Sequence, residues 1–233
     1  MNKEEFIKEV SLLGIEINDK QLKQLDNYKN YLIKYNEHTN LTRIINEEDI
    51  YLKHFYDSLT IVKFVDLKCI NTVLDIGTGA GFPGMVLKII FPNIKVTLLD
   101  SNNKKIHFLK ELSNILNIDV EIINDRAENF IKNKREYYDL VVSRAVAPLN
   151  ILLELAIPFV KIKGIFVSMK ANVEKELKDS SNTYKELGAN IKSINCFELI
   201  KECSSRTIIV YEKINSTNIK YPRLYDKIKK KPL

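Results

Sequence analysis

The chain has 233 residues, of which 45% are hydrophobic and 28% are charged, a composition typical of a globular protein with one substantial core. Its first residues are acidic and helical in pattern, which excludes a secretory signal, and no stretch approaches the roughly 18 consecutive apolar residues of a membrane span. Three cysteines without metal-ligand spacing, Cys69, Cys196 and Cys203, favour reduced thiols and no metal site. We expect a cytoplasmic protein.

Residues 1–65 are predicted to form a helical segment. A helix is expected over residues 21–36, with Asn18 or Asp19 as its N-cap, because Leu and Tyr recur there at helical spacing. A further helix is expected from Glu47 to Leu59. The Leu and Tyr stripe is interpreted as part of the core rather than as a platform on which bases stack.

From residue 71 the pattern changes to short runs rich in β-branched residues, each followed by a helix-like or loop segment. These runs cover residues 72–76, 95–100, 120–124, 138–145, 164–171, 191–199 and 205–214. Regular alternation of buried strands with helices indicates βαβ units. The sequence therefore predicts an α/β domain over residues 66–214, with about seven mostly parallel strands flanked by helices, followed by a basic C-terminal tail over residues 215–233.

A glycine-rich loop, LDIGTGAGFPGM (74–85), follows the first expected strand and precedes a helix that begins near Pro83. It holds the pattern D-x-G-x-G-x-G, formed by Asp75, Gly77, Gly79 and Gly81. Glycines this dense after a buried strand indicate a backbone that lies against a ligand. Two nucleotide-type ligands compete for such a loop, NAD(P) and S-adenosylmethionine.

Register and charge both disfavour NAD(P). The fingerprint G-x-G-x-x-G, counted from Gly77, requires a glycine where Phe82 stands. A pyrophosphate binds helix N-terminal amides, but Pro83 has no amide N–H and Asp75 adds a carboxylate beside the loop. S-adenosylmethionine carries a sulfonium and an ammonium group and no phosphate, so a neighbouring acid favours its binding. We therefore interpret the loop as a site for S-adenosylmethionine.

Two later strand ends add residues to this site. Asp100 ends the second strand, where a carboxylate can accept both hydroxyls of a ribose. Ala127 and Glu128 follow the third strand and are suited to flank an adenine, although Glu128 is open to a second interpretation as a solvated helix-capping acid. All these residues lie at the carboxyl ends of strands, where open α/β sheets bind ligands.

Six motifs in this order resemble those of the RsmG family, also called glucose-inhibited division protein B. They are NLTRI (40–44), HFYDSL (54–59), DIGTGAGFPG (75–84), VTLLDSNNKKIHFLKEL (96–112), RAEN (126–129) and VVSRAVAPL (141–149), and the terminal YPR…KKPL (221–233) is similar too. The tail departs from the family, because RLYDKI replaces the usual R-K-A-G-type sequence. The resemblance covers nearly the whole chain from about residue 20.

The resemblance implies a Rossmann-like class I S-adenosylmethionine-dependent methyltransferase. Members transfer a methyl group to N7 of one guanine in 16S ribosomal RNA, so the implied partner is 16S rRNA or a small-subunit intermediate. The cofactor contacts carried over from the family are Gly77, Phe82, Ala127, Glu128 and Arg144, and the physical interpretation of the loop adds Gly79 and Asp100. We expect a monomer without metal and without membrane contact.

Guanine N7 carries a lone pair and no proton, so its methylation requires no general base. Candidates for the substrate side are Asn40, Arg43, His54, Asp57 and Lys170, together with Arg144 from the cofactor set. Several of them are open to structural interpretations: His54 pins the helical segment to the NLT loop, Arg43 and Lys170 are solvated surface cations, and Arg144 forms a buried ion pair with Asp75 or Glu128.

The last fifteen residues, IKYPRLYDKIKKKPL, hold six basic side chains and one acidic side chain. Such clustering fits either contact with a polyanion or a frayed, solvated terminus. Tyr221 and Tyr225 are candidates for stacking on bases. Two other functions stay open on the residues alone: a methyltransferase that acts on a protein or small molecule, and a non-catalytic RNA-binding module.

Overall fold

The computed structural model describes residues 1–144, 146–171, 173–202 and 204–233. Their contacts divide the chain into two units, the first made of Met1–Asn71 and Thr78–Asn124, the second of Thr72–Gly77 and Asp125–Leu233. The division runs through the predicted α/β domain. It groups the N-terminal helices with residues 78–124, and the basic tail with the last four strands.

Seven strands form the sheet, in the order β3–β2–β1–β4–β5–β7–β6. Their bounds are β1 (Thr72–Ile76), β2 (Lys95–Asp100), β3 (Glu121–Asn124), β4 (Tyr138–Arg144), β5 (Val160–Lys170), β6 (Ala189–Leu199) and β7 (Ser204–Lys213). The pairs β2–β3, β1–β4 and β4–β5 are parallel, whereas β7 is antiparallel to both β5 and β6. The predicted seven-stranded, mostly parallel sheet is confirmed.

In the first unit, helices cover the N-terminal part of the chain and follow β1 and β2. They are α1 (Lys3–Leu12), α2 (Asp19–Thr39), α3 (Glu47–Asp49), the π-helix η1 (Ile50–Tyr56), α4 (Asp57–Leu59), the 3₁₀ turns η2 (Thr60–Lys63) and η3 (Leu67–Cys69), α5 (Gly84–Ile90) and α6 (Asn103–Leu116). Asn18 caps α2 and forms a capping box with Gln21, as its residue type predicts. Leu25, Tyr28 and Leu32 are fully buried, which confirms that the α2 stripe belongs to the core.

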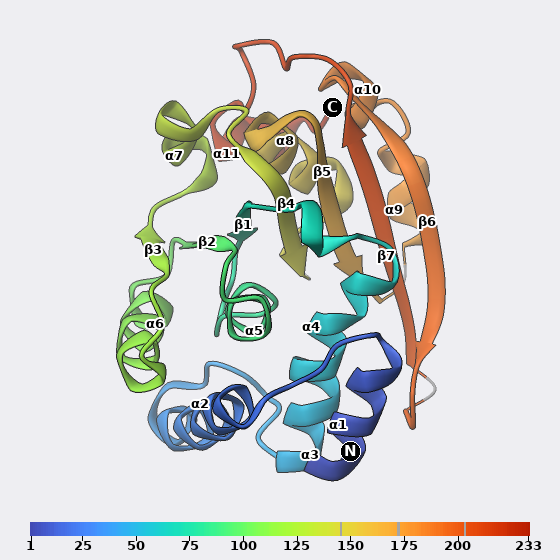
Figure 1. Cartoon of the computed structure of the whole chain (residues 1–233). Coiled ribbons are helices and arrows are strands. Elements are labelled where there is room, and N and C mark those ends of the chain that lie inside the picture. Colours follow the sequence, from blue (N-terminus) through green and yellow to red (C-terminus); the bar gives the residue numbers. More distant parts are fainter. Residues whose placement is uncertain (145, 172, 203) are drawn as a thin grey trace. The chain divides into compact units, whose positions relative to one another are not determined.

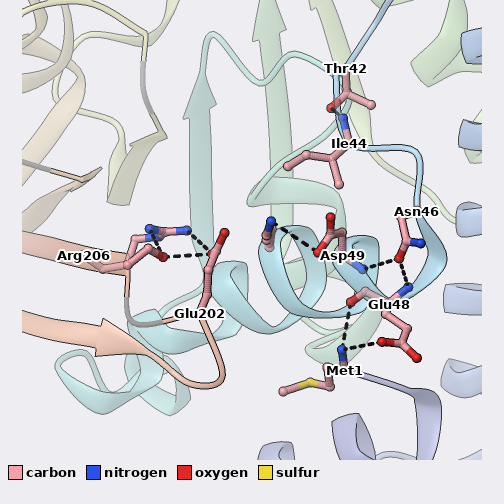
Figure 2. Close-up of polar contacts among 10 residues, drawn as sticks. Met1, Thr42, Ile44, Asn46, Glu48, Asp49, Glu202 and Arg206 are labelled. Atoms are coloured by element: carbon pink, nitrogen blue, oxygen red, sulfur yellow. Dashed lines mark hydrogen bonds and ion pairs between the residues drawn. The ribbon is translucent and has the colours of Figure 1, made fainter.

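The expected helix from Glu47 to Leu59 is present as α3, η1 and α4 in succession, with π geometry in its centre. The side chain of Asn46 begins it by accepting from the amides of Glu48 and Asp49 at 3.0 and 3.2 Å (Figure 2). The amino group of Met1 docks on the same turn and donates to the carbonyl of Glu48 at 3.3 Å.

In the second unit, helices α7 (Ala127–Lys134), α8 (Leu149–Ala156), α9 (Glu174–Asp179), α10 (Thr183–Glu186) and α11 (Tyr225–Lys230) accompany β1 and β4–β7, with the 3₁₀ turn η4 (Ile157–Phe159) after α8 (Figure 1). Helix α8 is almost entirely buried and contacts the other four helices. It is therefore the central helix of this unit.

Cys69 and Cys196 are exposed free thiols, and Cys203 lies outside the described residues. Within the described ranges no helix is long and apolar enough to cross a bilayer. The same ranges hold no group of three or more His, Cys, Asp or Glu residues arranged to take a metal ion.

Candidate functional site

The glycine-rich loop after β1 turns back onto the end of β2. The amide of Thr78 donates to the carbonyl of Leu99 at 3.1 Å, and the amide of Gly79 donates to Oδ2 of Asp100 at 3.0 Å. Gly79 has φ +63° and Gly81 has φ +99°, a region that favours glycine. The sequence pattern of the loop thus reflects a backbone conformation that other residues adopt only under strain.

Asp100, the last residue of β2, has a fixed carboxylate and an exposure of only 7%. Its Oδ1 accepts from the amide of Asn102 at 2.9 Å, and its Oδ2 accepts from Gly79 and from Nζ of Lys105 at 3.4 Å. Contacts on both oxygens hold the carboxylate plane in one orientation. A carboxylate oriented in this way can accept the two hydroxyls of a ribose.

Phe82 anchors the loop to the N-terminal helices. Its ring, 5% exposed, stacks on Tyr28 of α2 with centroids 5.2 Å apart, and on the imidazole of His54 with centroids 4.2 Å apart. The hydroxyl of Tyr28 also donates to the carbonyl of Ala80. The Phe82 side chain is therefore occupied by the protein core, and its backbone N–H donates to the carbonyl of Thr78 at 3.0 Å, so Phe82 fixes the shape of the loop.

Gly77 lies just beyond β1, in the second unit, with φ +67°. A Cβ at this position would come within 2.5 Å of Cγ2 of Val146. The hydroxyl of Ser143 in β4 donates to the carbonyl of Ile76 at 2.9 Å. Position 77 thus requires glycine, because any side chain there would collide with Val146.

Ala127 and Glu128 begin α7, as the loop after β3 predicts. Ala127 is 8% exposed, and the Glu128 side chain is 6% exposed. Oε1 of Glu128 lies 3.7 Å from Nη1 of Arg126, whose side chain is 57% exposed. The interpretation of Glu128 as a solvated helix-capping acid is wrong, because its side chain is only 6% exposed.

Arg144 ends β4 and is half-buried, in register with Met169 of β5. It comes two residues before Val146, the residue that packs on Gly77. The second unit thus carries Gly77, Ala127, Glu128 and Arg144 at or just beyond the carboxyl ends of strands β1, β3 and β4, as the sequence predicts.

Two substrate-side candidates, Asn40 and Arg43, line a cavity of about 690 Å³ in the first unit. Its walls are Asn36, Asn40, Leu41, Thr42, Arg43 and Ile45. Asn40 caps the C-terminal end of α2 in the left-handed conformation, with φ +51°. The side-chain amide of Asn36 donates from Nδ2 to the carbonyl of Thr42 at 2.9 Å, and its Oδ1 accepts from the backbone N–H of Thr42 at 3.0 Å. These two hydrogen bonds hold the loop against α2.

His54 and Asp57 are buried, with exposures of 6% and 5%. Nε2 of His54 lies 3.2 Å from the hydroxyl of Thr42, which also accepts from the amide of Ile44 at 3.1 Å. His54 therefore pins the helical segment to the NLT loop, which agrees with its structural interpretation. It also links that loop to Phe82, on which its ring stacks. Sequence reasoning missed Thr42, although it stands inside the NLT motif.

Lys170 ends β5 with its side chain 8% exposed. Its Nζ lies 2.6 Å from Oε2 of Glu176 and donates to the carbonyl of Ala147 at 2.6 Å. The alternative of a solvated surface lysine is wrong, because this ion pair removes the ammonium from water. The same oxygen of Glu176 accepts from the amide of Leu149 at 2.8 Å, so Lys170 and Glu176 together hold the start of α8.

The basic tail is folded, so its interpretation as a frayed, solvated terminus is wrong. Tyr221 is 5% exposed and is therefore not available to stack on a base. Tyr225 begins α11, and its half-exposed ring lies under the guanidinium of Arg126, 5.5 Å from Cζ.

The family model of GidB, described as rRNA small subunit methyltransferase G, matches residues 21–205. The chain belongs to this family. A family member from Bacillus subtilis, named ribosomal RNA small subunit methyltransferase G, is 44% identical over 227 residues, which cover 96% of this chain and 95% of the relative. A member of the same name from Exiguobacterium sibiricum is 42% identical over 237 residues and covers both chains completely. The predicted family and the predicted methyltransferase class are confirmed.

Solved structures agree with the fold. A SAM-dependent methyltransferase from Aquifex aeolicus superposes with a TM-score of 0.56 at 20% identity, covering 72% of this chain and 94% of that one. At this identity the similarity shows the fold alone. That fold is the Rossmann-like fold predicted from the sequence.

Proposed function

We propose that this protein transfers the methyl group of S-adenosylmethionine to N7 of one guanine in 16S ribosomal RNA. The observation that carries the proposal is the match of the family model to residues 21–205, a range that contains every residue assigned here to the cofactor and to the guanine. Relatives named for the small-subunit rRNA, similar over their whole length, support the substrate. We further propose that the protein acts as a monomer in the cytoplasm.

The residues of the chain fit the proposed cofactor. Asp100 offers an oriented carboxylate for the ribose hydroxyls, and the loop offers backbone without a Cβ at Gly77 and Gly79. Glu128 and Ala127 form the proposed adenine side, and Arg144 supplies a cation at the end of β4. Phe82, whose ring stacks on Tyr28 and on His54, has the proposed role of shaping the loop that contacts the cofactor.

S-adenosylmethionine, when bound, supplies a methyl group activated by a positively charged sulfur. Guanine N7 attacks with its own lone pair, so the chain needs no residue that removes a proton. The task of the residues is to hold the two reactants in line, and positioning of this kind supplies about 7–11 kcal/mol of a barrier. Positive charge develops on the purine, where nearby dipoles or a carboxylate would stabilise it.

We propose that Asn40 and Arg43 contact the RNA, because both line the cavity and both side chains are exposed. His54 and Asp57 are buried. Their proposed role is to hold the loop in position, with His54 acting through Thr42. The proposed role of Lys170 is also indirect: its ion pair with Glu176 holds the start of α8 in position.

The test is methyl transfer in vitro. Purified protein is incubated with tritiated S-adenosylmethionine and total RNA from cells that lack this modification, and the labelled nucleoside is identified. The proposal expects label in 16S rRNA as 7-methylguanosine. Label in protein, or in another nucleoside, would overturn the acceptor, whereas a failure to bind S-adenosylhomocysteine in calorimetry would overturn the cofactor.

A further inference from the structure

The last part of the chain is dense in positive charge and is fixed to the second unit. The hydroxyl of Tyr221 donates to Oε1 of Glu186 at 3.0 Å, and the carbonyl of Tyr221 accepts from the guanidinium of Arg135. At the far end, the hydroxyl of Thr183 donates to the carbonyl of Leu233 at 2.8 Å. The tail is therefore held at both ends.

A buried ion pair anchors its middle. Arg223 donates from its backbone N–H and its Nε to Oε1 of Glu154, at 2.9 and 2.8 Å, and from Nη2 to Oε2 at 2.6 Å. The Glu154 carboxylate is completely buried in α8. Such a bidentate pair fixes the tail strongly, because either partner alone would be left as an uncompensated charge. Because its guanidinium is engaged by Glu154, Arg223 is not available to a ligand.

Helix α11 follows at once and has two different faces. Ile228 is fully buried, and Tyr225 packs under Arg126 at the start of α7. The lysines of the helix and of the residue after it, Lys227, Lys229, Lys230 and Lys231, are all exposed. Three acids belong to the same neighbourhood. Asp226 is exposed, Glu128 pairs with Arg126, and Oδ1 of Asp125 accepts from the backbone N–H of Arg126 at 2.7 Å.

We propose that Arg126, Lys227, Lys229, Lys230 and Lys231 form a basic surface that binds phosphates of the RNA substrate. The proposal rests on the proposed function and adds to it how this RNA is held. Five cations against three acids leave an excess of positive charge. Because their backbone is anchored by Glu154, Glu186 and Thr183, binding does not have to order a flexible tail.

An RNA backbone fits this surface better than an anionic membrane does. A helix that lies in a membrane interface inserts its apolar face among the lipids. The aliphatic residue within α11 is Ile228, and it is already buried against the protein. Leu224 and Ile219 are exposed, but both precede the helix and form no apolar helix face. Lysines at successive exposed positions match the closely spaced phosphates of a nucleic acid.

The test replaces three exposed lysines of the surface by glutamine, Lys227→Gln, Lys229→Gln and Lys230→Gln. The matched control replaces three exposed lysines of the same unit in α9 and β6, Lys175→Gln, Lys178→Gln and Lys192→Gln. Binding of transcribed 16S rRNA is measured at several salt concentrations. Circular dichroism and thermal unfolding establish that both variants keep the fold.

The proposal expects the α11 variant to bind RNA about tenfold or more weakly at physiological salt. The slope of log affinity against log salt becomes shallower by about 2 to 3, since each lost phosphate contact contributes about 0.7–0.9. KM for RNA rises, while kcat at saturating RNA stays that of the wild type. The control keeps the wild-type affinity and slope.

An unchanged slope in the α11 variant, or an equal loss in the control, would overturn the proposal. So would an α11 variant that binds RNA normally but loses binding to vesicles of phosphatidylglycerol and phosphatidylcholine. Failure of the proposed function has a different signature, because the wild-type protein would then transfer no methyl group to any RNA, whatever its affinity.

Discussion

The amide of Gly79 donates a hydrogen bond to Oδ2 of Asp100 at 3.0 Å, which joins the glycine-rich loop to the end of β2. The loop conformation and the carboxylate orientation thus depend on each other. A change at either residue is expected to disturb both the backbone and the acid of the proposed cofactor site.

Gly79→Val should abolish cofactor binding. Gly79 has φ +63°, where a β-branched residue is strongly strained, and the added side chain would stand on the loop backbone assigned to the ligand. Calorimetry with S-adenosylhomocysteine checks this, with Gly14→Val as a matched control, since Gly14 has φ +76° and an added Cβ there meets no atom within 4 Å. Wild-type affinity in Gly79→Val would refute the assignment of the loop.

Asp100→Asn should weaken binding of S-adenosylhomocysteine by about 10- to 100-fold, or about 1–3 kcal/mol. The amide keeps one acceptor oxygen, but it places an NH₂ group where the carboxylate now accepts a backbone N–H or a ribose hydroxyl. Glu121→Gln serves as a control, because Glu121 is an exposed acid at the start of β3. Equal affinities for wild type and Asp100→Asn would remove Asp100 from the site.

Arg144→Ala should cost activity more than stability. We expect kcat/KM to fall by about 100-fold, the size of effect that positioning in an active site has, while the free energy of unfolding changes by about 1 kcal/mol or less. Arg144→Lys keeps the charge and loses the planar guanidinium, so it separates the two properties. A variant that is inactive because it is unfolded would instead support a buried structural ion pair.

His54→Ala should destabilise the protein by about 1–3 kcal/mol and weaken cofactor binding, because it removes the ring stacked on Phe82 and the partner of Thr42. Thr42→Val removes both hydrogen bonds of the hydroxyl, with His54 and with the amide of Ile44, and keeps the stack, so about 1–2 kcal/mol is expected. Urea unfolding measures both. If His54→Ala changed only KM for RNA and left stability intact, His54 would be a substrate contact rather than a pin.

Lys213 predicts a pH dependence of stability. Burial lowers the pKa of its ammonium from 10.5 to about 8, an effect that the nearby carboxylate of Glu136 partly offsets. Below about pH 8 the lysine is charged in both states, so the folded state bears the whole cost of burying the charge. Between about pH 8 and 10.5 the unfolded state binds the proton more tightly, and the contribution of Lys213 to the free energy of unfolding rises by about 3 kcal/mol.

Comparison with Lys213→Met isolates this contribution, since the other titrating groups are common to both proteins. Urea unfolding at about pH 7 and about pH 10.5 should show the wild type gaining about 3 kcal/mol relative to the variant. A difference between the two proteins that does not change with pH would show that Lys213 titrates near its ordinary value.

Much of the fold follows from local pattern. Strands β1 and β2 have the bounds that their apolar runs predict, because a buried strand between turn residues leaves little choice of register. The π geometry of η1 was not predictable, since apolar periodicity indicates a helix without fixing its hydrogen-bond pattern. The carboxyl-end positions of Gly77, Asp100, Glu128 and Arg144 followed from the strand assignments alone.

The side-chain partners that the sequence did not predict are mostly contacts between residues distant in sequence. Glu154 holds Arg223 from 69 residues away, and no local feature of the tail indicates that its partner is a buried acid of α8. The hydroxyl of Tyr28 reaches Ala80 across 52 residues. Even partners close in sequence can escape prediction. Glu176 stands only six residues after Lys170, but their pairing depends on the directions of the two side chains, which sequence spacing does not fix.

The location of the transferred methyl group decides whether this protein methylates guanine N7 in 16S rRNA. Small ribosomal subunits and naked 16S rRNA, both from cells that lack the modification, are incubated with the protein and labelled S-adenosylmethionine, and the label is mapped by cleavage at 7-methylguanosine. We predict a single labelled guanine in 16S rRNA from at least one of the two substrates. Absence of label from both, or label on any atom other than N7, would contradict it.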